Sequence, residues 1–459
     1  MTETAENRAA DLKASDHRHY MHPFTDHKEL GEKGGTRIIT RADGVYIYDS
    51  EGNKILDGMA GLWCVNLGYG RQELVDAATR QMQELPYYNS FFQCTHPPAI
   101  ELSGLLSELS PGNFNHVFFT GSGSEANDTQ IRLIRRYWDL QGQPEKMTII
   151  ARKNAYHGST LGGASLGGMS AMHEQMVLPV PGIVHIEQPY QFELGAEMSA
   201  GEFGLQQARL LEQTILELGV DKVAAFIAEP VQGAGGVIIP PDSYWPEIQR
   251  ICDEYGILLV ADEVITAFGR LGEWFGSTHF GIRPDLISIA KGVSSGYLPL
   301  GGALVSDRVA DVVIAEGGEF AHGYTYSGHP AACAVALAAL RIMREEGIVE
   351  RVRDHTAPYF NQRWAGLAEH PIVGEARSLG LMGAIEIVRD KDSRERFHKD
   401  LAMGSRCRDF CVENDLVMRA VGETMIVSPP LISEDSHIDE LVDKAWKCLD
   451  LTAESAGAG

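Results

Sequence analysis

The 459-residue chain lacks a surplus of positive charge, a long apolar run and a framework of paired cysteines. Its formal net charge is -24 at pH 7, and such an acidic surface repels phosphate backbones and anionic lipids, so we expect neither nucleic acid nor membranes as partners. No stretch approaches the ~20 apolar residues of a membrane span, and the N-terminal region has no apolar signal segment. Seven cysteines, an odd number, predict reduced thiols and a cytoplasmic protein.

Side chains that could bind a metal are few as well. Segment 16–22 is rich in histidine, and Cys407 and Cys411 are four residues apart in a predicted helix. The chain has no His-Glu-x-x-His sequence and no Cys-x-x-Cys pair. We therefore expect no metal site: a solvated N-terminal arm and two semi-buried thiols explain these residues better than a metal or redox centre does.

Short apolar runs alternate with helical stretches over the middle of the chain, which is typical of an α/β fold. The predicted strands are residues 116–120, 147–150, 223–228, 257–261, 286–290 and 302–306. The predicted helices are residues 71–84, 98–109, 124–140, 202–218, 244–255 and 329–346. Strands this apolar are buried on both faces, so we expect a mostly parallel central sheet with helices on both faces.

The length of the chain predicts one large domain and one smaller domain. Residues 1–65 form an N-terminal arm and a β-hairpin at 36–57, which we assign to the small domain. Residues 66–328 form the large domain. Residues 329–459 mix helices with short strands, so the smaller α+β domain is built from both termini.

Polar residues follow the predicted strands, and ligands of open parallel sheets bind at those carboxyl ends. The turn at 121–127 offers glycines, serines and a helix N-terminus, which suits a phosphate, although a plain N-cap at Ser122 or Ser124 fits equally well. Asp262 ends a very apolar strand, either as a structural carboxylate or as the partner of a cationic ring nitrogen.

Lys291 ends another apolar strand, where a charged ammonium is costly. Desolvation lowers the pKa of such a lysine and makes its amine a nucleophile that can form a Schiff base. A phosphate turn, a buried aspartate and a buried lysine together match one cofactor, pyridoxal 5'-phosphate. A non-catalytic nucleotide-binding module using only the glycine-serine turn would leave Lys291 and Asp262 unexplained.

From His22 to Leu451 the chain resembles the class III (ω-) aminotransferases of the fold-type I pyridoxal-phosphate enzymes, and more narrowly their amine:pyruvate and putrescine:pyruvate branch. The motifs that carry the resemblance are Asp57–Trp63, Gly121–Asn127, Tyr156–Thr160, Glu229–Gly236, Asp262–Val264, Ala290–Gly292 and His322–Pro330. The fold implied is that of pyridoxal-phosphate-dependent transferases of fold type I.

The resemblance implies a role for each matching residue. Lys291 would form the Schiff base and shuttle the proton, and Asp262 would pair with the pyridinium nitrogen. The other implied cofactor-binding residues are Gly123 and Ser124 (phosphate), Tyr156 and Val264 (ring faces), Glu229 and Gln232 (near the ring hydroxyl) and Thr325 (phosphate, from the neighbouring subunit). The implied substrate-binding residues are Phe24, Trp63, Phe91, Ala234 and Arg419. Because Thr325 would cross between subunits, a homodimer is expected, with a tetramer left open.

The reaction implied is a ping-pong transfer of an amino group from an amine or ω-amino acid to a keto acid, most simply pyruvate, giving alanine and an aldehyde or ketone. Arg419 would swing in to bind the keto acid carboxylate and swing out for the amine. Putrescine, β-alanine, taurine and an aromatic amine all remain open as donors. Thr266, Ala267 and Leu271, which are expected beside the cofactor, differ from the residues that many relatives have at these positions. The detailed substrate preference of those relatives therefore does not transfer to this chain.

Other functions remain to be weighed. A class III relative that acts as a decarboxylase or an aminomutase would use the same cofactor. Gly163–Gly167 also fits the Gly-x-Ser-x-Gly nucleophile elbow of hydrolases, with Ser165 as the nucleophile. That elbow must follow a strand directly, whereas the preceding apolar run ends near Ile150, so a serine hydrolase is the remotest alternative.

Overall fold

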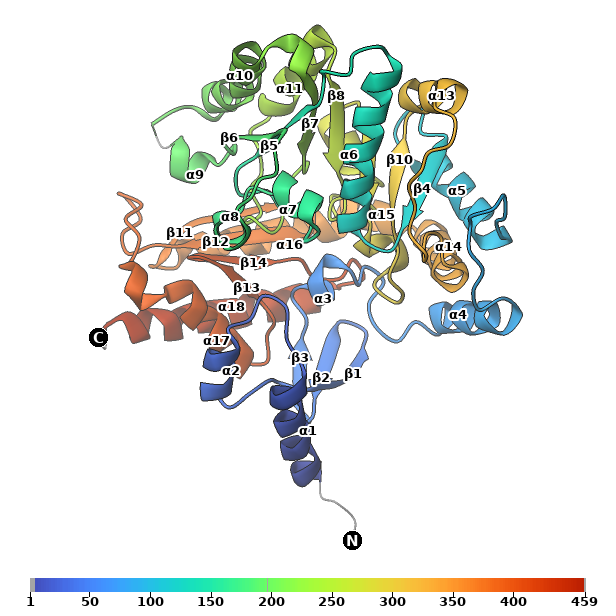
Figure 1. The fold of residues 1–459 in the computed structure, drawn as a ribbon. Coiled ribbons are helices and arrows are strands. Elements are labelled where there is room, and N and C mark those ends of the chain that lie inside the picture. Colours follow the sequence, from blue (N-terminus) through green and yellow to red (C-terminus); the bar gives the residue numbers. More distant parts are fainter. Residues whose placement is uncertain (1–4, 196, 458–459) are drawn as a thin grey trace.

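The computed structural model describes residues 5–195 and 197–457 (Figure 1). Residues 1–4, 196 and 458–459, which include the ends of the predicted segments 1–65 and 329–459, lie outside the described residues. A seven-stranded sheet has the order β4-β10-β9-β8-β7-β5-β6. Its strands are β4 (His116–Thr120), β5 (Thr148–Arg152), β6 (Ile183–Ile186), β7 (Val223–Ala228), β8 (Leu258–Asp262), β9 (Leu286–Ile289) and β10 (Gly301–Val305).

The sheet is mostly parallel, as predicted. The neighbouring strands from β6 to β9 pair in parallel, whereas β10 is antiparallel to both β4 and β9. The sequence analysis missed β6, a four-residue strand with a histidine in it, and did not predict the reversed direction of β10. An apolar run reads the same in both directions, so its composition cannot give its orientation.

Helices cover both faces of this sheet (Figure 1). Ala225 and Ile227 of β7 pack in one apolar cluster with α6 (Gly123–Leu140) and α13 (Asp307–Glu316). Phe226 and Ala228, which point the other way, pack with α10 (Ala200–Leu218) and α11 (Tyr244–Tyr255). This alternation buries every residue of β7, as expected for a strand covered on both sides.

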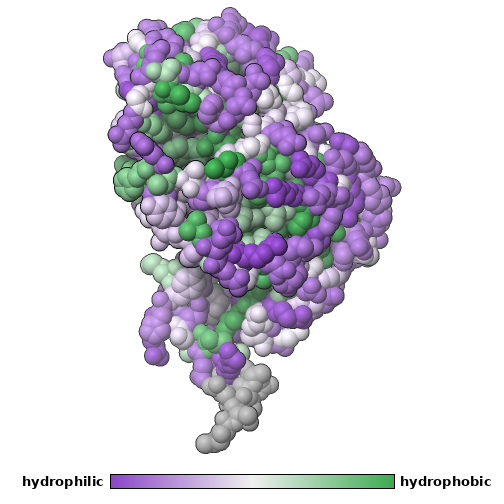
Figure 2. All heavy atoms as spheres, turned by 90° about the vertical axis from the view of Figure 1, so that its right-hand side faces the viewer, coloured by the Kyte–Doolittle hydropathy of each residue, from purple (hydrophilic) through white to green (hydrophobic). Residues whose placement is uncertain are grey.

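A further layer consists of α4 (Gln72–Glu84), α5 (Pro97–Leu109) and α14 (Pro330–Glu345), whose buried residues join a cluster with Ile287 and Leu304. Seen from this side, the molecule shows apolar side chains in hollows between polar rims (Figure 2). The shorter helices are α7 (Leu161–Leu166), α8 (Ser170–Met176), α9 (Gln191–Leu194), α12 (Gly276–Phe280) and α15 (Ile348–Arg351).

The N-terminal and C-terminal regions of the chain lie next to each other beside the large sheet (Figure 1). Near the N-terminus, α1 (Ala5–His19), α2 (His27–Glu32) and α3 (Ala60–Trp63) flank an antiparallel sheet of β1 (Ile39–Asp43), β2 (Tyr46–Asp49) and β3 (Lys54–Leu56). The predicted hairpin is therefore incomplete, because β1 adds a third strand before Gly44. Leu56 forms backbone hydrogen bonds with Asp415 and Val417, which join this sheet to the C-terminal region.

The C-terminal region forms a second antiparallel sheet. Its strands, in spatial order, are β11 (Val373–Leu379), β12 (Met382–Ile387), β14 (Thr424–Val427) and β13 (Arg419–Val421), and its helices are α16 (Ala357–Ala365), α17 (Met403–Glu413) and α18 (Asp435–Gly457). All strands of the seven-stranded sheet lie within 66–328, but the exact division at 65 and 328 stays a prediction.

The described residues bear on the predicted absences too. None of their helices combines the length and apolar character that crossing a bilayer requires. No group of three or more potential metal ligands occurs in that part of the chain. Asp16 instead accepts hydrogen bonds from His22 and Thr36. Cys407 and Cys411 are fully buried in one apolar cluster with Cys448, so they are more deeply packed than predicted.

Candidate active site

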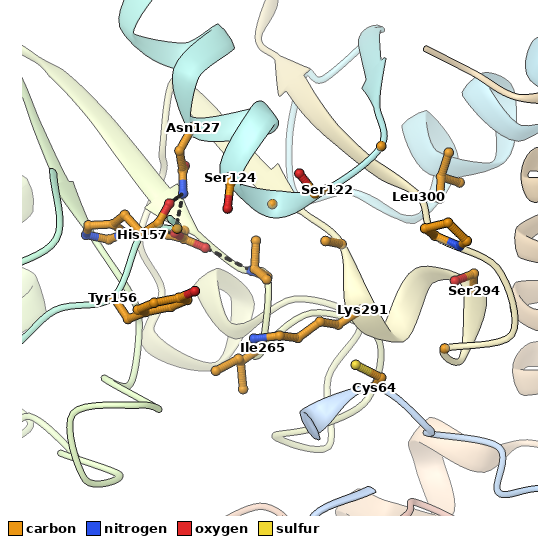
Figure 3. Close-up of a pocket in the computed structure, with 18 of the residues that line it drawn as sticks. Cys64, Ser122, Ser124, Asn127, Tyr156, His157, Ile265, Lys291, Ser294 and Leu300 are labelled. Atoms are coloured by element: carbon orange, nitrogen blue, oxygen red, sulfur yellow. Dashed lines mark hydrogen bonds and ion pairs between the residues drawn. The ribbon is translucent and has the colours of Figure 1, made fainter. Parts of the chain in front are cut away.

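A cavity of about 380 Å³ opens at the carboxyl ends of the parallel strands (Figure 3). It is lined by Cys64, Gly121, Ser122, Gly123, Ser124, Asn127, Tyr156, His157, Gly158, Glu229, Asp262, Val264, Ile265, Ala290, Lys291, Ser294, Gly296, Leu298, Pro299 and Leu300. Segments that follow β4, β5, β7, β8 and β9 thus converge on one space. This is the location that open α/β sheets use for ligands.

One end of the cavity is the N-terminus of α6. Ser122 caps this helix by accepting a hydrogen bond from the Glu125 N–H, and the Glu125 carboxylate accepts from the Gly121 N–H. Among the described residues, no group accepts a hydrogen bond from the N–H group of Gly123 or of Ser124. Free N–H groups at the positive end of an 18-residue helix form a site for an anion.

Asp262 is held rigidly at the end of β8. Its Oδ2 accepts hydrogen bonds from Asn127 Nδ2 and His157 Nδ1, each at 2.7 Å, and its Oδ1 accepts from the Val264 N–H. The side chain is almost wholly buried. Because Nδ1 of His157 donates, its Nε2 carries no proton in the neutral ring, and this buried atom has no hydrogen-bond partner.

Lys291 follows β9 and extends into the cavity (Figure 3). Desolvation lowers the pKa of its amine, against the opposing influence of Cys64, Asp262 and Glu229. No hydrogen bond or ion pair to this amine occurs among the described residues. The backbone of Lys291 has a φ of +48°, a left-handed conformation that is unfavourable for a lysine. Strain of this kind concentrates at functional sites.

Tyr156 and Val264 line the same cavity as Asp262 and Lys291. Tyr156 presents its ring to the cavity (Figure 3), and Val264 also lines it, against Gly123. A Cβ atom on Gly123 would lie 2.9 Å from Val264 Cγ2, so only glycine fits there. Glu229 accepts hydrogen bonds from the N–H groups of Tyr156 and Gly233, and burial raises the pKa of its carboxyl. Tyr156, Val264 and Glu229 thus line the same cavity as the anion site of α6.

Comparison with known proteins identifies this arrangement. The family model described as "Aminotransferase class-III" matches residues 30–449. The chain belongs to the class III aminotransferases. It is 61% identical over 435 residues to the putrescine–pyruvate aminotransferase of Pseudomonas aeruginosa. The aligned region covers 95% of this chain and 95% of that protein.

Solved structures agree with this assignment. An (S)-enantioselective ω-transaminase from Thermomicrobium roseum superimposes with a TM-score of 0.93 at 42% identity and covers 97% of this chain and 98% of that one. The ω-transaminase of Pseudomonas jessenii, in complex with PMP, has a TM-score of 0.94 at 39% identity and covers 98% and 99%. The predicted transferase fold is therefore confirmed.

Class III aminotransferases depend on pyridoxal 5'-phosphate, and the residues of the cavity fit that cofactor. Free N–H groups suit its phosphate, a fixed carboxylate suits its ring nitrogen, and the side chains of Tyr156 and Val264 offer surfaces to its flat ring. A desolvated amine on Lys291 suits its aldehyde. When bound, the cofactor supplies an aldehyde that links covalently to amines and a ring that withdraws electrons from the attached carbon.

Not every predicted site residue of this aminotransferase lines the cavity. Gln232 is buried behind it, where its Nε2 donates to the Lys153 carbonyl. Thr325 lines a neighbouring cavity of about 740 Å³, which shares Gly121 and Ser122 with the first. The remaining predicted cofactor-binding residues line the cavity: Gly123, Ser124, Tyr156, Glu229, Asp262, Val264 and Lys291.

The predicted substrate residues surround the cavity rather than line it. Phe24 is 75% exposed, with its ring edge-on to Tyr156 at 6.4 Å. Trp63 is buried in an apolar cluster with Ile265, which does line the cavity. Phe91 lies against Gly323, outside the cavity.

Ala234 and Arg419 complete the predicted set. Ala234 is buried in the loop that follows Glu229. Arg419 begins β13, and burial lowers the pKa of its guanidinium, with Tyr156 as the opposing influence. No described residue forms a hydrogen bond or an ion pair with this guanidinium.

Several lining residues carry no role in the sequence analysis. Asn127 and His157 fix Asp262, although they lie in motifs that the sequence analysis had singled out. Cys64 lies beside Lys291, and its pKa is raised by burial. Asn127 lies one helical turn after Gly123, so its position on the cavity face of α6 was a usable signal. The approach of His157 to Asp262 bridges 105 residues, and no local pattern predicts it.

The departures from relatives fall away from the reacting groups. Thr266 donates a hydrogen bond to the buried Glu263 carboxylate, and Ala267 and Leu271 are buried among apolar side chains. The structure does not support Ser165 as the nucleophile of a hydrolase. Ser165 is fully buried in α7, where its hydroxyl donates to the Leu161 carbonyl, so a substrate cannot reach it.

Proposed function

We propose that this class III aminotransferase moves an amino group from a primary amine, with a putrescine-like diamine as the first candidate, to pyruvate. The products are alanine and an aldehyde or ketone. The observation that carries the proposal is the cavity in which Lys291, Asp262 and the free N–H groups of α6 converge. The choice of substrates is supported by the 61% identity to an enzyme named for putrescine and pyruvate.

Each cavity residue has a defined task in this proposal. Lys291 would hold the cofactor through its aldehyde, and its amine would move a proton at the amine carbon of the substrate. The lowered pKa of Lys291 supports this task, because the neutral amine is both the nucleophile and the base. Asp262 keeps a proton on the ring nitrogen, and Asn127 and His157 hold its carboxylate in place.

The remaining cofactor contacts are the ones that the family resemblance implies. Gly123 and Ser124 bind the phosphate, Tyr156 and Val264 cover the two faces of the ring, and Glu229 lies near the ring hydroxyl with Gln232 behind it.

Arg419 separates the two half-reactions. Its guanidinium has no partner among the described residues, and a free guanidinium can form paired hydrogen bonds with the carboxylate of pyruvate. A simple amine lacks that carboxylate, so Arg419 points away when the donor binds. Phe24, Trp63 and Ala234 shape the space that the rest of the substrate occupies, since each lies next to a residue or loop of the cavity, and Phe91 does so from Gly323, which lines the neighbouring cavity.

We infer that the active form is a homodimer. Thr325 is exposed at the edge of the second cavity, beside the anion end of the first. Exposed aromatic side chains occur next to Thr325 in the sequence, at Tyr326, and in the segment between α4 and α5, at Tyr87, Tyr88, Phe91 and Phe92. A second copy that covers this surface would bury these rings and would bring one Thr325 to each phosphate site.

An absorption experiment tests the proposed function. The purified protein with bound pyridoxal 5'-phosphate is expected to show a visible band that disappears with putrescine and returns with pyruvate. A band that responds to other amines but not to putrescine would change the donor and keep the reaction. Evolved carbon dioxide, or turnover without a keto acid, would favour a decarboxylase or an aminomutase. The absence of any band after cofactor is added would contradict the role of Lys291.

A further inference from the structure

The segment that leads to Thr325 is attached to helix α6 by side chains on one face of that helix. Arg136 Nη2 donates to the Gly317 carbonyl, and Arg132 Nη2 donates to the Ala321 carbonyl, each at 2.8 Å. One turn earlier, the Thr129 hydroxyl lies 2.9 Å from His322 Nε2. Residues three and four apart share a helix face, so these three side chains form one continuous attachment.

The hydrogen bonds around His322 define its protonation state. The Thr129 hydroxyl donates to the Glu125 carbonyl, so it accepts the proton on His322 Nε2. Arg132 Nη1 lies 3.3 Å from His322 Nδ1, and a guanidinium can only donate, so Nδ1 accepts. The ring is therefore neutral, with its hydrogen on Nε2. It also stacks on Phe118 of β4, with ring centroids 5.3 Å apart.

Other contacts hold the far side of the same loop. The Tyr87 hydroxyl donates to the Thr325 carbonyl at 2.6 Å, and the Tyr324 hydroxyl donates to the Glu125 carbonyl at 3.2 Å. The carbonyl of Thr325 and the side chain of the preceding Tyr324 are thus both held in place, while the side chain of Thr325 remains exposed. Helix α6 offers free N–H groups at Gly123 and Ser124 to one phosphate site, and it also positions the loop that carries Thr325.

We propose that His322 is a positioning residue for the cofactor phosphate of the neighbouring subunit. In its neutral form it holds the loop against α6, so that the Thr325 hydroxyl reaches that phosphate. This inference rests on the proposed function, because it requires the cofactor and the dimer. Both subunits contribute to each phosphate site, so a change at His322 in one subunit alters cofactor binding in the other.

The test measures cofactor affinity rather than turnover. Cofactor-free wild-type protein and the variants His322→Ala, Thr325→Ala and the double variant are titrated with pyridoxal 5'-phosphate and with pyridoxal, which lacks the phosphate. Each single variant is expected to bind pyridoxal 5'-phosphate about ten-fold more weakly, as for loss of one hydrogen bond to a charged group. Affinity for pyridoxal should not change. The double variant should bind no more weakly than Thr325→Ala, because both act through one contact.

Matched variants separate positioning from general damage. Arg135→Ala alters the same helix at a residue that donates no hydrogen bond to the segment 317–322 among the described contacts, and it should bind like the wild type. His322→Gln keeps a donor for Thr129 and should recover most of the affinity. If His322→Ala does not fold, Arg132→Ala removes the contacts to His322 and Ala321 and is expected to give the same selective loss.

Each contrary result has a distinct meaning. A wild-type protein that does not bind pyridoxal 5'-phosphate contradicts the proposed function itself. If the wild type binds and His322→Ala binds within about two-fold of it, the positioning role is wrong. Equal losses of affinity for pyridoxal 5'-phosphate and for pyridoxal would also overturn the positioning role. The same holds if the affinity losses of His322→Ala and Thr325→Ala add in the double variant, because His322 would then act independently of the contact between Thr325 and the phosphate.

Discussion

His157 Nδ1 donates a hydrogen bond of 2.7 Å to Asp262 Oδ2, and both side chains are almost wholly buried. The same oxygen accepts from Asn127, and the other carboxylate oxygen accepts from the Val264 backbone. Three donors from three segments therefore fix one carboxylate at the floor of the cavity. A buried carboxylate without such donors would be strongly unfavourable, so the three hydrogen bonds offset the cost of burying this side chain.

Asp262→Asn is expected to lower kcat by about 10²-fold while cofactor remains bound, because a neutral amide does not hold the proton on the ring nitrogen. Steady-state kinetics with putrescine and pyruvate would measure this loss. Asp285→Asn is a matched control: Asp285 precedes β9, accepts from Leu259 and Arg308, and should affect stability without affecting kcat. Equal kcat losses in the two variants would contradict a specific role for Asp262.

Lys291→Ala is expected to abolish turnover, with a loss of at least about 10⁴-fold, in a protein that still folds. The desolvation that lowers the pKa of Lys291 also opposes folding at neutral pH, because the unfolded chain binds the proton more tightly. In cofactor-free wild-type protein this cost shrinks as the pH rises toward the ordinary lysine pKa, and it is absent from the variant.

Urea unfolding of both cofactor-free proteins, near neutral pH and at alkaline pH, measures this difference. The exposed Lys153, paired with Glu187, provides the control variant Lys153→Ala, which should retain activity. Substantial turnover by Lys291→Ala would remove the basis of the proposed function.

Arg419→Ala is expected to raise the KM for pyruvate by about 10- to 100-fold, with much less effect on putrescine, because only the keto acid offers a carboxylate to the guanidinium. Single-turnover measurements of each half-reaction would separate the two effects. Arg389, in an exposed ion pair with Glu395, is the control arginine in the same region of the chain. Equal losses in both half-reactions would refute the swinging role of Arg419.

Acidification is expected to weaken the attachment of residues 317–325 to helix α6. Desolvation and the nearby Arg132 guanidinium lower the pKa of His322, and Arg132 is the charged side chain that contacts its ring. The stability that the neutral ring contributes is complete above the unfolded pKa of about 6.5 and is lost as the pH falls through the lower folded value.

Cofactor affinity measured across this range should therefore fall with acidification more steeply in the wild type than in His322→Gln, whose amide does not titrate. Identical pH profiles for the two proteins would show that His322 does not control the loop.

Local sequence patterns were sufficient for much of the fold. Short, mostly apolar runs marked six strands of the central sheet, and helical periodicity located α4, α5, α6, α10, α11 and α14 to within about two residues. The four residues of β6 were too few to predict a strand. The residues of β1 lie within the predicted hairpin at 36–57 and were not recognised as a separate strand. The reversed direction of β10 depends on how the chain returns to the sheet after Lys291, which no property of residues 301–305 reveals.

The sequence by itself determined the chemistry of this protein, because residue types at strand ends are local facts: Lys291, Asp262 and the glycine-serine turn each follow an apolar run. Only the tertiary structure decided how those groups are held. The hydrogen bond between His157 and Asp262, the left-handed backbone of Lys291 and the attachment of His322 to α6 join segments far apart in the chain. Their geometry is set by packing of the whole sheet and its helices, and short-range patterns contain no record of it.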